Sequence, residues 1–422
     1  MNNKLAQDLS DAIAQIPVIN SHSHMWPEQK RLETEADALV FFDHPYPRAD
    51  LITAGMSMAE VRRALSPGLP WAERWCIFAR YWPAIRFTGY SQSILIAFRD
   101  LFGVSALTAA TVEPLSDALR RSAVPGFYKE ILQDRCGIET SVMQMEDLVE
   151  VDPELFLPMP RLNRFTMVES LDQLQAIERD YNASIGSLGD YLELVRRVCA
   201  DWKRTRVAGV KLSQSYHRRM DFVERDDSLA RQAFEKLLRG AHQGLESPDG
   251  RLLEDYLVFE GCRAASEQGL TIQFHLGLRA GNWGSLEGSS AAPMVPLMRA
   301  FPQARFDLSH SGYPYLHEST VLAKTFPNLY LDLSWIHIVS PVGVREALRE
   351  WLRAVPYTKI IAFGDDVYHP EMVYGHLRVA QDNVAVVLAE TIEEGVMTEE
   401  QAMDVAHALF YDNPKALYLE TH

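Results

Sequence analysis

Short runs rich in β-branched and apolar residues recur along this chain, and helical stretches separate them. Most of these runs end in polar residues, which is the alternation typical of a parallel α/β fold. The later runs are spaced so that one helix fits after each strand. The sequence therefore predicts an α/β fold whose parallel strands close into a (β/α)8 TIM barrel. The eight candidate strands are 17–20, 138–144, a segment around 161–165, 207–213, 270–275, 304–310, 328–335 and 359–366.

The gap between the first two candidate strands is the main departure from a plain barrel. More than 100 residues separate them, which is too many for an ordinary strand-to-helix connection. Met, Trp and Leu recur at helical spacings between Ala54 and Gly103. We therefore expect one unit over 1–422, with a helical insertion over 25–137 that forms a lid between strands 1 and 2, and further helices at the C-terminal end.

The composition excludes some classes of partner. With 41 Lys and Arg against 57 Asp and Glu, the formal net charge is −16, and such a chain repels nucleic acid and anionic membranes. The four cysteines lie far apart without a CxxC pair, as is typical of reduced thiols. The N-terminus lacks the basic start and apolar core of a signal peptide, and no apolar run approaches about 18 residues. We expect a soluble, cytoplasmic protein that acts on a small-molecule substrate.

Side chains of the metal-binding type stand at the ends of several candidate strands. His22 and His24 end the first strand, and alternate residues of a strand share one face. Two neutral imidazoles that converge on one point suit a divalent metal. His275, His310 and Asp365 end the fifth, sixth and eighth candidate strands. Active sites of (β/α)8 barrels lie at this end, so the five residues indicate a metal site.

These residues and their surroundings resemble the amidohydrolase superfamily, and the resemblance extends over nearly the whole chain. The shared pattern is HxH after strand 1, His after strands 5 and 6, and Asp after strand 8. More narrowly, the chain is similar to the branch that contains uronate isomerase and the amidohydrolase-like domain of nodulin and glutamine synthetase fusion proteins. The similar segments are IPVINSHSHMWPE, TGYSQSILIAFRDLFG, VKLSQSYHRRMDF, IQFHLGL, LSHSGYPY, LYLDLSW and FGDDVYHPE.

The resemblance implies which residues hold and use the metal. It makes His22, His24 and Asp365 ligands of one divalent ion, zinc or manganese, with His275 as a ligand or a near neighbour. It makes His310 the group that polarises the substrate. Asp365 is then expected to take a proton from metal-activated water and to pass it to the leaving group. The expected catalytic residues are Asp365, His310 and His275.

Lys211 and Asp366 leave alternatives open. Some superfamily members carry a carbamylated lysine between two metals at the position of Lys211. This branch resembles mononuclear proteins, so one ion is preferred to a pair. An uncarbamylated Lys211 places a positive charge near the pocket and favours an anionic substrate. Asp366 adjoins the expected ligand and is expected to orient a histidine ligand from behind.

A substrate-binding set is expected around the barrel mouth. Relatives carry a Tyr-Arg pair after strand 4, where this chain has Tyr216 followed by Arg218 and Arg219. An arginine there binds a carboxylate well, and a plain salt bridge is the alternative. Trp335 and His369 follow strands 7 and 8. The expected substrate-binding residues are Lys211, Tyr216, Arg218, Trp335 and His369.

This set of residues supports several functions. We expect a metal-dependent hydrolase in which metal-activated water cleaves an amide, lactone or ester bond of a small carboxylate-bearing substrate. The alternatives are an isomerase of a uronate-type sugar acid, a non-oxidative decarboxylase on the same metal site, and an inactive scaffold barrel. The sequence contains no GxSxG motif that would offer a serine nucleophile and no phosphate-binding loop. No cofactor other than the metal is expected. The resemblance further implies a homo-oligomer.

Overall fold

Eight parallel strands form the centre of the computed structural model, which describes residues 3–34 and 37–420. The strands pair in chain order, β1 with β2 and β2 with β3, then β4 through β8 in succession. This architecture confirms the predicted (β/α)8 barrel. The strands are β1 Val18–Ser23, β2 Ile138–Met145, β3 Phe156–Pro160, β4 Gly209–Leu212, β5 Thr271–His275, β6 Arg305–Ser309, β7 Leu329–Asp332 and β8 Ile360–Ile361.

Backbone hydrogen bonds join the two strand ladders into a closed ring. Between β3 and β4, the Ala208 N–H donates to Pro158 O at 2.8 Å. On the other side, the Ser21 N–H donates to Phe363 O at 3.0 Å, so β1 lies beside the segment that continues β8. Closure brings the carboxyl ends of all eight strands to one end of the barrel.

The third strand lies earlier in the chain than predicted. The prediction placed it around 161–165, but the strand is Phe156–Pro160 and the predicted segment leads into the short helix α10, Asn163–Thr166. Pro158 and Pro160 hid the strand, because proline lacks the N–H that a strand ladder uses. Both prolines nevertheless pair in register with β2.

Helices surround the barrel and follow most of the later strands. The 24-residue α19 packs against α1, α7 and α18. The helices are α1 Asn3–Ile13, α11 Leu171–Asp180, α12 Leu188–Arg204, α13 Asp227–Leu238, α14 Pro248–Glu267, α15 Val295–Ala300, α16 Leu316–Thr325, α17 Ile336–Val339, α18 Pro341–Ala354, α19 Pro370–Glu393, α20 Glu399–His407 and α21 Asn413–Tyr418. Shorter turns are η3 Gln214–Tyr216, η4 Ala292–Met294, η5 His310–Gly312, η6 Tyr357–Lys359 and η7 Ala408–Asp412.

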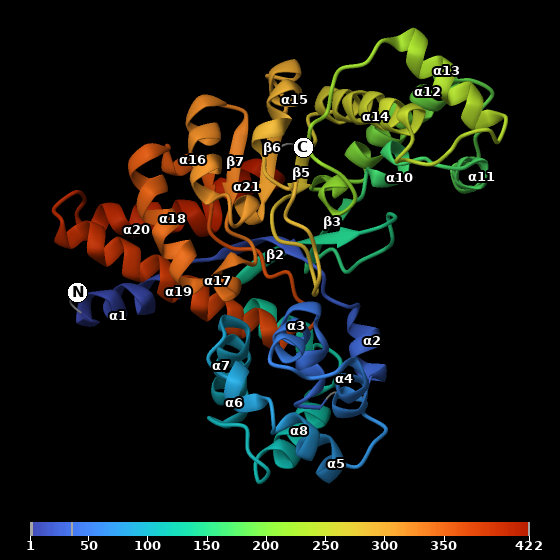
Figure 1. Ribbon diagram of the computed structural model, residues 1–422. Coiled ribbons are helices and arrows are strands. Elements are labelled where there is room, and N and C mark those ends of the chain that lie inside the picture. The colour runs from blue at the N-terminus through green and yellow to red at the C-terminus, as the bar shows by residue number, and fades with distance from the viewer. Residues whose placement is uncertain (1–2, 35–36, 421–422) are drawn as a thin grey trace.

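The segment between β1 and β2 is helical, as predicted, and its helices gather into one group below the strands in Figure 1. This helical insertion docks on the barrel through α7 and α19. At their crossing, a Cβ on Gly375 would lie 1.9 Å from Ser93 O, so only glycine allows the approach. The elements are α2 Glu28–Glu33, η1 Val40–Asp43, α3 Pro45–Thr53, α4 Met58–Leu65, α5 Trp71–Phe78, α6 Trp82–Ile85, α7 Gly89–Phe102, α8 Val112–Ser122, α9 Phe127–Lys129 and η2 Glu130–Arg135.

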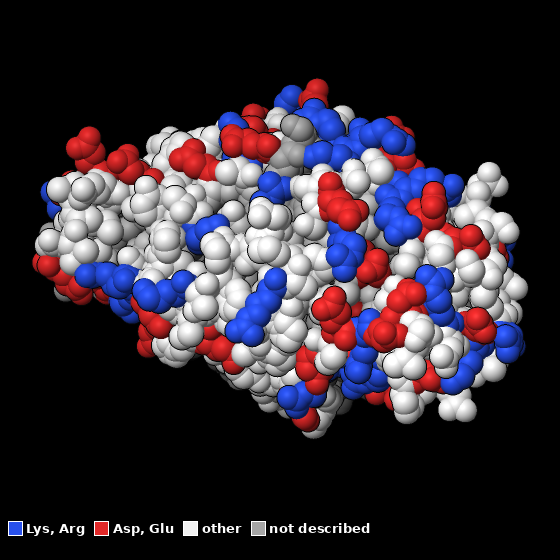
Figure 2. All heavy atoms as spheres, turned by 90° about the horizontal axis from the view of Figure 1, so that it is seen from above, with Lys and Arg blue, Asp and Glu red and all other residues white. Residues whose placement is uncertain are grey.

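The surface mixes both signs of charge. On the face that Figure 2 shows, Lys and Arg side chains alternate with Asp and Glu side chains at short range. Among the helices of the described residues, none combines the length and the apolar character that crossing a membrane requires. The outer bounds predicted for the unit, residues 1 and 422, lie outside the described residues.

Candidate functional site

The ends of several strands bring polar residues to one end of the barrel. His22 lies on β1, and His24 follows that strand directly. The residues after β6, β7 and β8 leave the extended conformation, because His310, Trp335 and Asp366 have φ of 64°, 68° and 51°. Positive φ is uncommon outside glycine and is concentrated at functional sites. The chain therefore holds strained backbone at three successive strand ends around one point.

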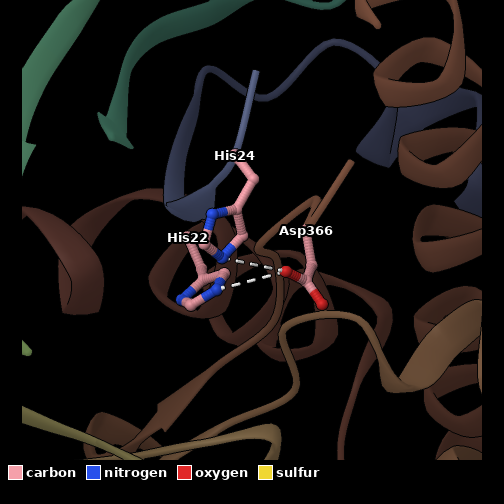
Figure 3. A group of neighbouring side chains, drawn as sticks. All are labelled: His22, His24 and Asp366. Carbon is pink, nitrogen blue, oxygen red and sulfur yellow. Dashed lines mark ion pairs between the residues drawn. The ribbon is translucent and has the colours of Figure 1, made fainter. Parts of the chain in front are cut away.

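Three side chains from β1 and the loop after β8 meet at that point (Figure 3). His22 Nε2 lies 3.3 Å from Asp366 Oδ1, and His24 Nε2 lies 3.4 Å from the same oxygen. Within the described part of the chain, this is the one group of three or more His, Cys, Asp and Glu residues whose ligand atoms all lie within 4.8 Å of one another. We refer to His22, His24 and Asp366 as the metal cluster.

The surroundings of the metal cluster fit a divalent ion. His22 Nδ1 lies 2.9 Å from Gln273 Oε1, which only accepts hydrogen bonds, so the ring proton is on Nδ1 and the Nε2 lone pair faces Asp366. Burial lowers the pKa of His22 and of His24 well below the ordinary value, so both rings are neutral. Asp366 Oδ2 is buried without a hydrogen-bond partner. Such a donor set, two neutral nitrogens and a carboxylate, suits Zn²⁺ or Mn²⁺.

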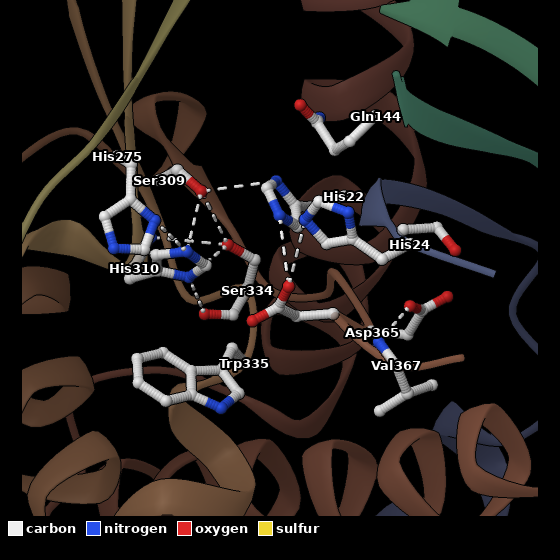
Figure 4. A network of polar contacts seen from close by, with 12 residues as sticks. His22, His24, Gln144, His275, Ser309, His310, Ser334, Trp335, Asp365 and Val367 are labelled. Atoms are coloured by element: carbon white, nitrogen blue, oxygen red, sulfur yellow. Dashed lines mark hydrogen bonds and ion pairs between the residues drawn. The ribbon is translucent and has the colours of Figure 1, made fainter. Parts of the chain in front are cut away.

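Asp365, the predicted carboxylate ligand, points away from the metal cluster (Figure 4). One of its oxygens accepts a hydrogen bond from the Val367 N–H at 2.9 Å, and the other accepts one from the Asn20 amide. Burial raises the pKa of Asp365 to about 7. This placement corrects the prediction, because the positive φ of Asp366 turns the second carboxylate of the pair into the site. Asp365 instead stabilises the loop after β8 through its hydrogen bonds with Val367 and Asn20.

His275 and His310 form a second pair beside the metal cluster (Figure 4). His310 Nε2 lies 3.1 Å from His275 Nδ1, and the His310 ring lies 5.1 Å from the His22 ring. His310 Nδ1 lies 3.0 Å from Ser334 O, and this carbonyl fixes the ring proton on Nδ1. The catalytic roles of His275 and His310, and metal ligation by His275, stay predictions.

A cavity of about 610 Å³ opens over the metal cluster. Lys211 on β4 lies at its base, where Nζ donates to Gln273 Oε1 at 2.8 Å and lies 3.5 Å from His22 Nδ1. Burial lowers the pKa of Lys211 below its ordinary value. The cavity is lined by His22, His24, His44, Pro45, Tyr46, Glu146, Arg161, Asn163, Arg164, Met167, Lys211, Ser213, Tyr216, His217, His275, Ala280, Asp366 and Tyr368.

The predicted substrate-binding residues after β4 separate into two groups. Lys211 and Tyr216 line the cavity, whereas Arg218 does not. Arg218 is buried, and its guanidinium donates to Glu254 Oε2 at 3.1 Å and to Asp255 Oδ1 at 2.7 Å. This geometry favours the alternative of a plain salt bridge for Arg218, because two buried carboxylates hold its guanidinium.

Trp335 and His369 lie behind the cavity wall. Trp335 is fully buried, its indole N–H donates to Tyr90 OH, and its ring centroid lies 4.2 Å from that of Tyr46. His369 is buried, and its ring centroid lies 4.9 Å from that of Trp26. Neither side chain lines the cavity, and their predicted contact with substrate stays a prediction.

The cavity also contains residues that the sequence did not single out. Arg161 and Arg164 follow β3, and His44 and Tyr46 come from the helical insertion. Arg161 pairs with Glu146 at 2.6 Å, and its Nε is buried without a hydrogen-bond partner. The place of Arg161 directly after a strand was the available signal, and the misplaced third strand concealed it.

Comparison with known proteins relates the chain to one superfamily. The model of the amidohydrolase family matches residues 191–419, which is more than half of the chain. The uronate isomerase of Rhizorhabdus wittichii is 22% identical over 98% of this chain and 95% of its own length. Protein fluG of Emericella nidulans is 29% identical over 50% of this chain. The match covers 25% of fluG, so this chain spans only about a quarter of that protein's length.

Solved structures share the fold over nearly the full length. A uronate isomerase from Thermotoga maritima superposes with a TM-score of 0.82 at 16% identity, covering 99% of this chain and 97% of the other. A glucuronate isomerase from Caulobacter crescentus gives a TM-score of 0.80 at 19% identity, covering 98% and 94%. The shared fold therefore includes the helical insertion as well as the barrel.

Proposed function

Because this chain belongs to the amidohydrolase family, within its uronate isomerase-like branch, we propose that it is a metal-dependent isomerase of a uronate-type sugar acid. The observation that carries the proposal is the extent of the likeness to uronate isomerases, which runs over 98% of the chain. It includes the helical insertion, which supplies His44 and Tyr46 to the cavity. This reading replaces the hydrolase that the residue pattern first favoured.

We propose that the metal cluster holds one divalent ion, zinc or manganese. When bound there, such an ion supplies Lewis acidity toward a carbonyl or hydroxyl oxygen of the substrate. Lys211 lies near Nδ1 of His22, 3.5 Å away, whereas Asp366 lies near Nε2. A carbamylated Lys211 would therefore stand on the wrong side of the ring to share the ion, which favours one metal over two.

Arg161 and Lys211 give one wall of the cavity the positive charge that a sugar acid requires. Their backbones pair where the chain leaves β3 beside β4. The ion-pair partner of Arg161, Glu146, has a side chain that is 75% exposed, and Arg161 Nε has no partner. A guanidinium with a free N–H binds a carboxylate through directed, charge-assisted hydrogen bonds. We therefore place the substrate carboxylate at this wall.

The isomerisation moves one proton between neighbouring carbons. In the aldose-to-ketose direction, the C2 proton passes to a base and is returned to C1, while the hydroxyl proton moves from O2 to O1. Asp366 is the proposed base, because its Oδ1 faces the two histidines and its Oδ2 is free of hydrogen bonds. His44 and Tyr46 line the same cavity from the helical insertion.

A direct assay tests this function. The purified protein, loaded with Zn²⁺ or Mn²⁺, is incubated with glucuronate and other hexuronates, and ketose formation is measured. We expect a ketose product that is absent with a folded His22→Ala/His24→Ala double variant. Release of carbon dioxide, or cleavage of lactones and amides without ketose formation, would favour the decarboxylase or the hydrolase. A folded protein that binds no metal and converts none of these compounds would favour the inactive scaffold.

A further inference from the structure

A column of buried polar side chains runs through the barrel beneath the metal cluster. Alternate residues of β5, namely Thr271, Gln273 and His275, carry it. At one end Thr271 Oγ1 donates to Leu417 O at 2.7 Å, and at the other His275 contacts His310. Gln273 stands between these ends with 0% exposure. Buried polar groups are hydrogen-bonded in nearly all proteins. The partners of the Gln273 carboxamide therefore show which of its two ends is the nitrogen, which donates, and which is the oxygen, which accepts.

The amide nitrogen of Gln273 is held by partners on β6 and α21, and it also donates to Ser21 O on β1 at 3.3 Å. Gln273 Nε2 donates to Asp307 Oδ2 at 2.6 Å and to Tyr418 OH at 2.9 Å. The Tyr418 hydroxyl in turn donates to Asp307. Asp307 and Tyr418 are both 0% exposed. Because these partners accept from the nitrogen, the carboxamide oxygen is the atom that faces the donors on its other side.

On that side the oxygen meets the first histidine of the metal cluster. Gln273 Oε1 lies 2.9 Å from His22 Nδ1, and it also accepts from Lys211 Nζ at 2.8 Å and from Gln144 Nε2 at 3.0 Å. An amide oxygen cannot donate, so His22 carries its proton on Nδ1. The Nε2 lone pair is then directed at Asp366, which lies 3.3 Å away.

We propose that Gln273 and Tyr418 are positioning residues of the metal cluster, which set the tautomer and the ring orientation of His22 from inside the barrel. Gln273 acts on His22 directly, and Tyr418 acts through Gln273. Neither residue lines the cavity, so neither contacts the substrate. The last helix, α21, is thereby coupled to the site. This inference rests on the proposed metal site and is independent of the reaction performed there.

Metal binding by three variants tests the proposal. Gln273→Met keeps the length of the side chain and removes the bridge, and Tyr418→Phe keeps the ring and removes the hydroxyl. Gln214→Met is the matched control, because Gln214 is also fully buried and bonds to Thr166 rather than to a member of the metal cluster. Each protein is loaded with Co²⁺. Competition with a chelator gives the affinity, and the visible absorption spectrum reports the geometry around the ion.

We expect Gln273→Met to weaken Co²⁺ binding about 10- to 100-fold and to change the spectrum, as loss of a partner behind a ligand does. Tyr418→Phe should weaken binding less, and Gln214→Met should leave affinity and spectrum unchanged. Unchanged affinity and spectrum in Gln273→Met would overturn the proposal, even with a lower melting temperature. If Gln273→Met does not fold, the same result in Tyr418→Phe overturns it. A wild-type protein that binds no metal overturns the site itself, whereas metal binding without isomerisation overturns only the proposed reaction.

Discussion

The floor and the wall of the cavity are built in different ways. The floor is the metal cluster, whose first histidine donates to Gln273 Oε1 in the barrel interior. The wall compared with it, separate from the charged wall of Arg161 and Lys211, is formed by His44 and Tyr46 of the helical insertion, which pack against aromatic rings. The His44 ring centroid lies 4.4 Å from that of Tyr368, and the Tyr46 centroid lies 4.2 Å from that of Trp335.

This difference separates the chemistry of the site from its choice of substrate. Hydrogen bonds to a histidine ring fix the direction of one lone pair, which is what metal binding demands. Aromatic packing fixes the shape of a wall, which is what selection of a substrate demands. The uronate isomerase matches run over 98% of the chain and so include both the floor and the helical insertion. Changes to the floor and to the wall should therefore affect different measurements.

The largest effect is expected for Asp366→Asn in the floor, which keeps the shape and removes the carboxylate. General acid–base catalysis contributes 10²–10⁴-fold, so kcat/KM for the uronate should fall by about that factor, and bound metal should fall as well. Asp365→Asn is the matched control and should retain metal and most of the activity, since its oxygens bond to Val367 N–H and Asn20. Kinetics and elemental analysis check both. The reverse outcome would return the ligand position to Asp365.

The next effect compares two arginines that follow β3 and β4. Arg161→Met removes the proposed carboxylate-binding group, and hydrogen bonds to charged groups contribute about 1.5–3 kcal/mol, so KM should rise about 10- to 100-fold with little change in kcat. Arg218→Met should leave KM unchanged. It should lower the free energy of unfolding by about 3–5 kcal/mol, because Glu254 and Asp255 lose their buried partner. An unchanged KM in Arg161→Met would place the substrate carboxylate elsewhere.

The barrel and most of the floor could be predicted, because the signals that reveal them lie within short segments of sequence. These signals are the alternation of residues along a strand and the polar residues at the strand's end. His22 on β1 and His24 directly after it are two residues apart, so a strand-end pattern places them on one side whatever surrounds them. The choice between Asp365 and Asp366 could not be made, because it depends on one positive φ after a strand of two residues. The role of Gln273 was also out of reach, since its bonds join β1, β6 and the last helix.

The wall formed by His44 and Tyr46 could not be predicted at all. His44 and Tyr46 lie in a segment whose helical pattern indicates packing but gives no direction toward the barrel. Arg161 was missed for a different reason, because Pro158 and Pro160 argue against a strand. Arg218 shows the opposite failure, in which a residue type suited to a carboxylate substrate binds carboxylates of the protein itself.

A smaller effect is expected where the wall docks on the barrel. In Gly375→Ala the new Cβ would meet Ser93 O, and overpacking of this kind costs about 1–3 kcal/mol of the free energy of unfolding. The shifted insertion should raise KM while the bound metal stays at the wild-type level. Gly68→Ala, in the same insertion, is the control, because a Cβ there meets nothing closer than 4.0 Å. Thermal unfolding and kinetics check the pair. Loss of metal in Gly375→Ala would mean that floor and wall are not independent.

The smallest effect is expected for Tyr46→Phe, which keeps the ring beside Trp335 and removes the hydroxyl. Tyr46 and Tyr216 both line the cavity, and the contact between their side chains ties the insertion to the loop after β4. A net hydrogen bond contributes about 0.5–1.5 kcal/mol, so kcat/KM should fall by about tenfold at most, with metal content unchanged. Tyr216→Phe should lower kcat/KM by a similar factor. The double variant should lower it little further, because both substitutions remove the same contact. A loss as large as that of Asp366→Asn would mean that the wall moves a proton, and the division between chemistry in the floor and shape in the wall would fail.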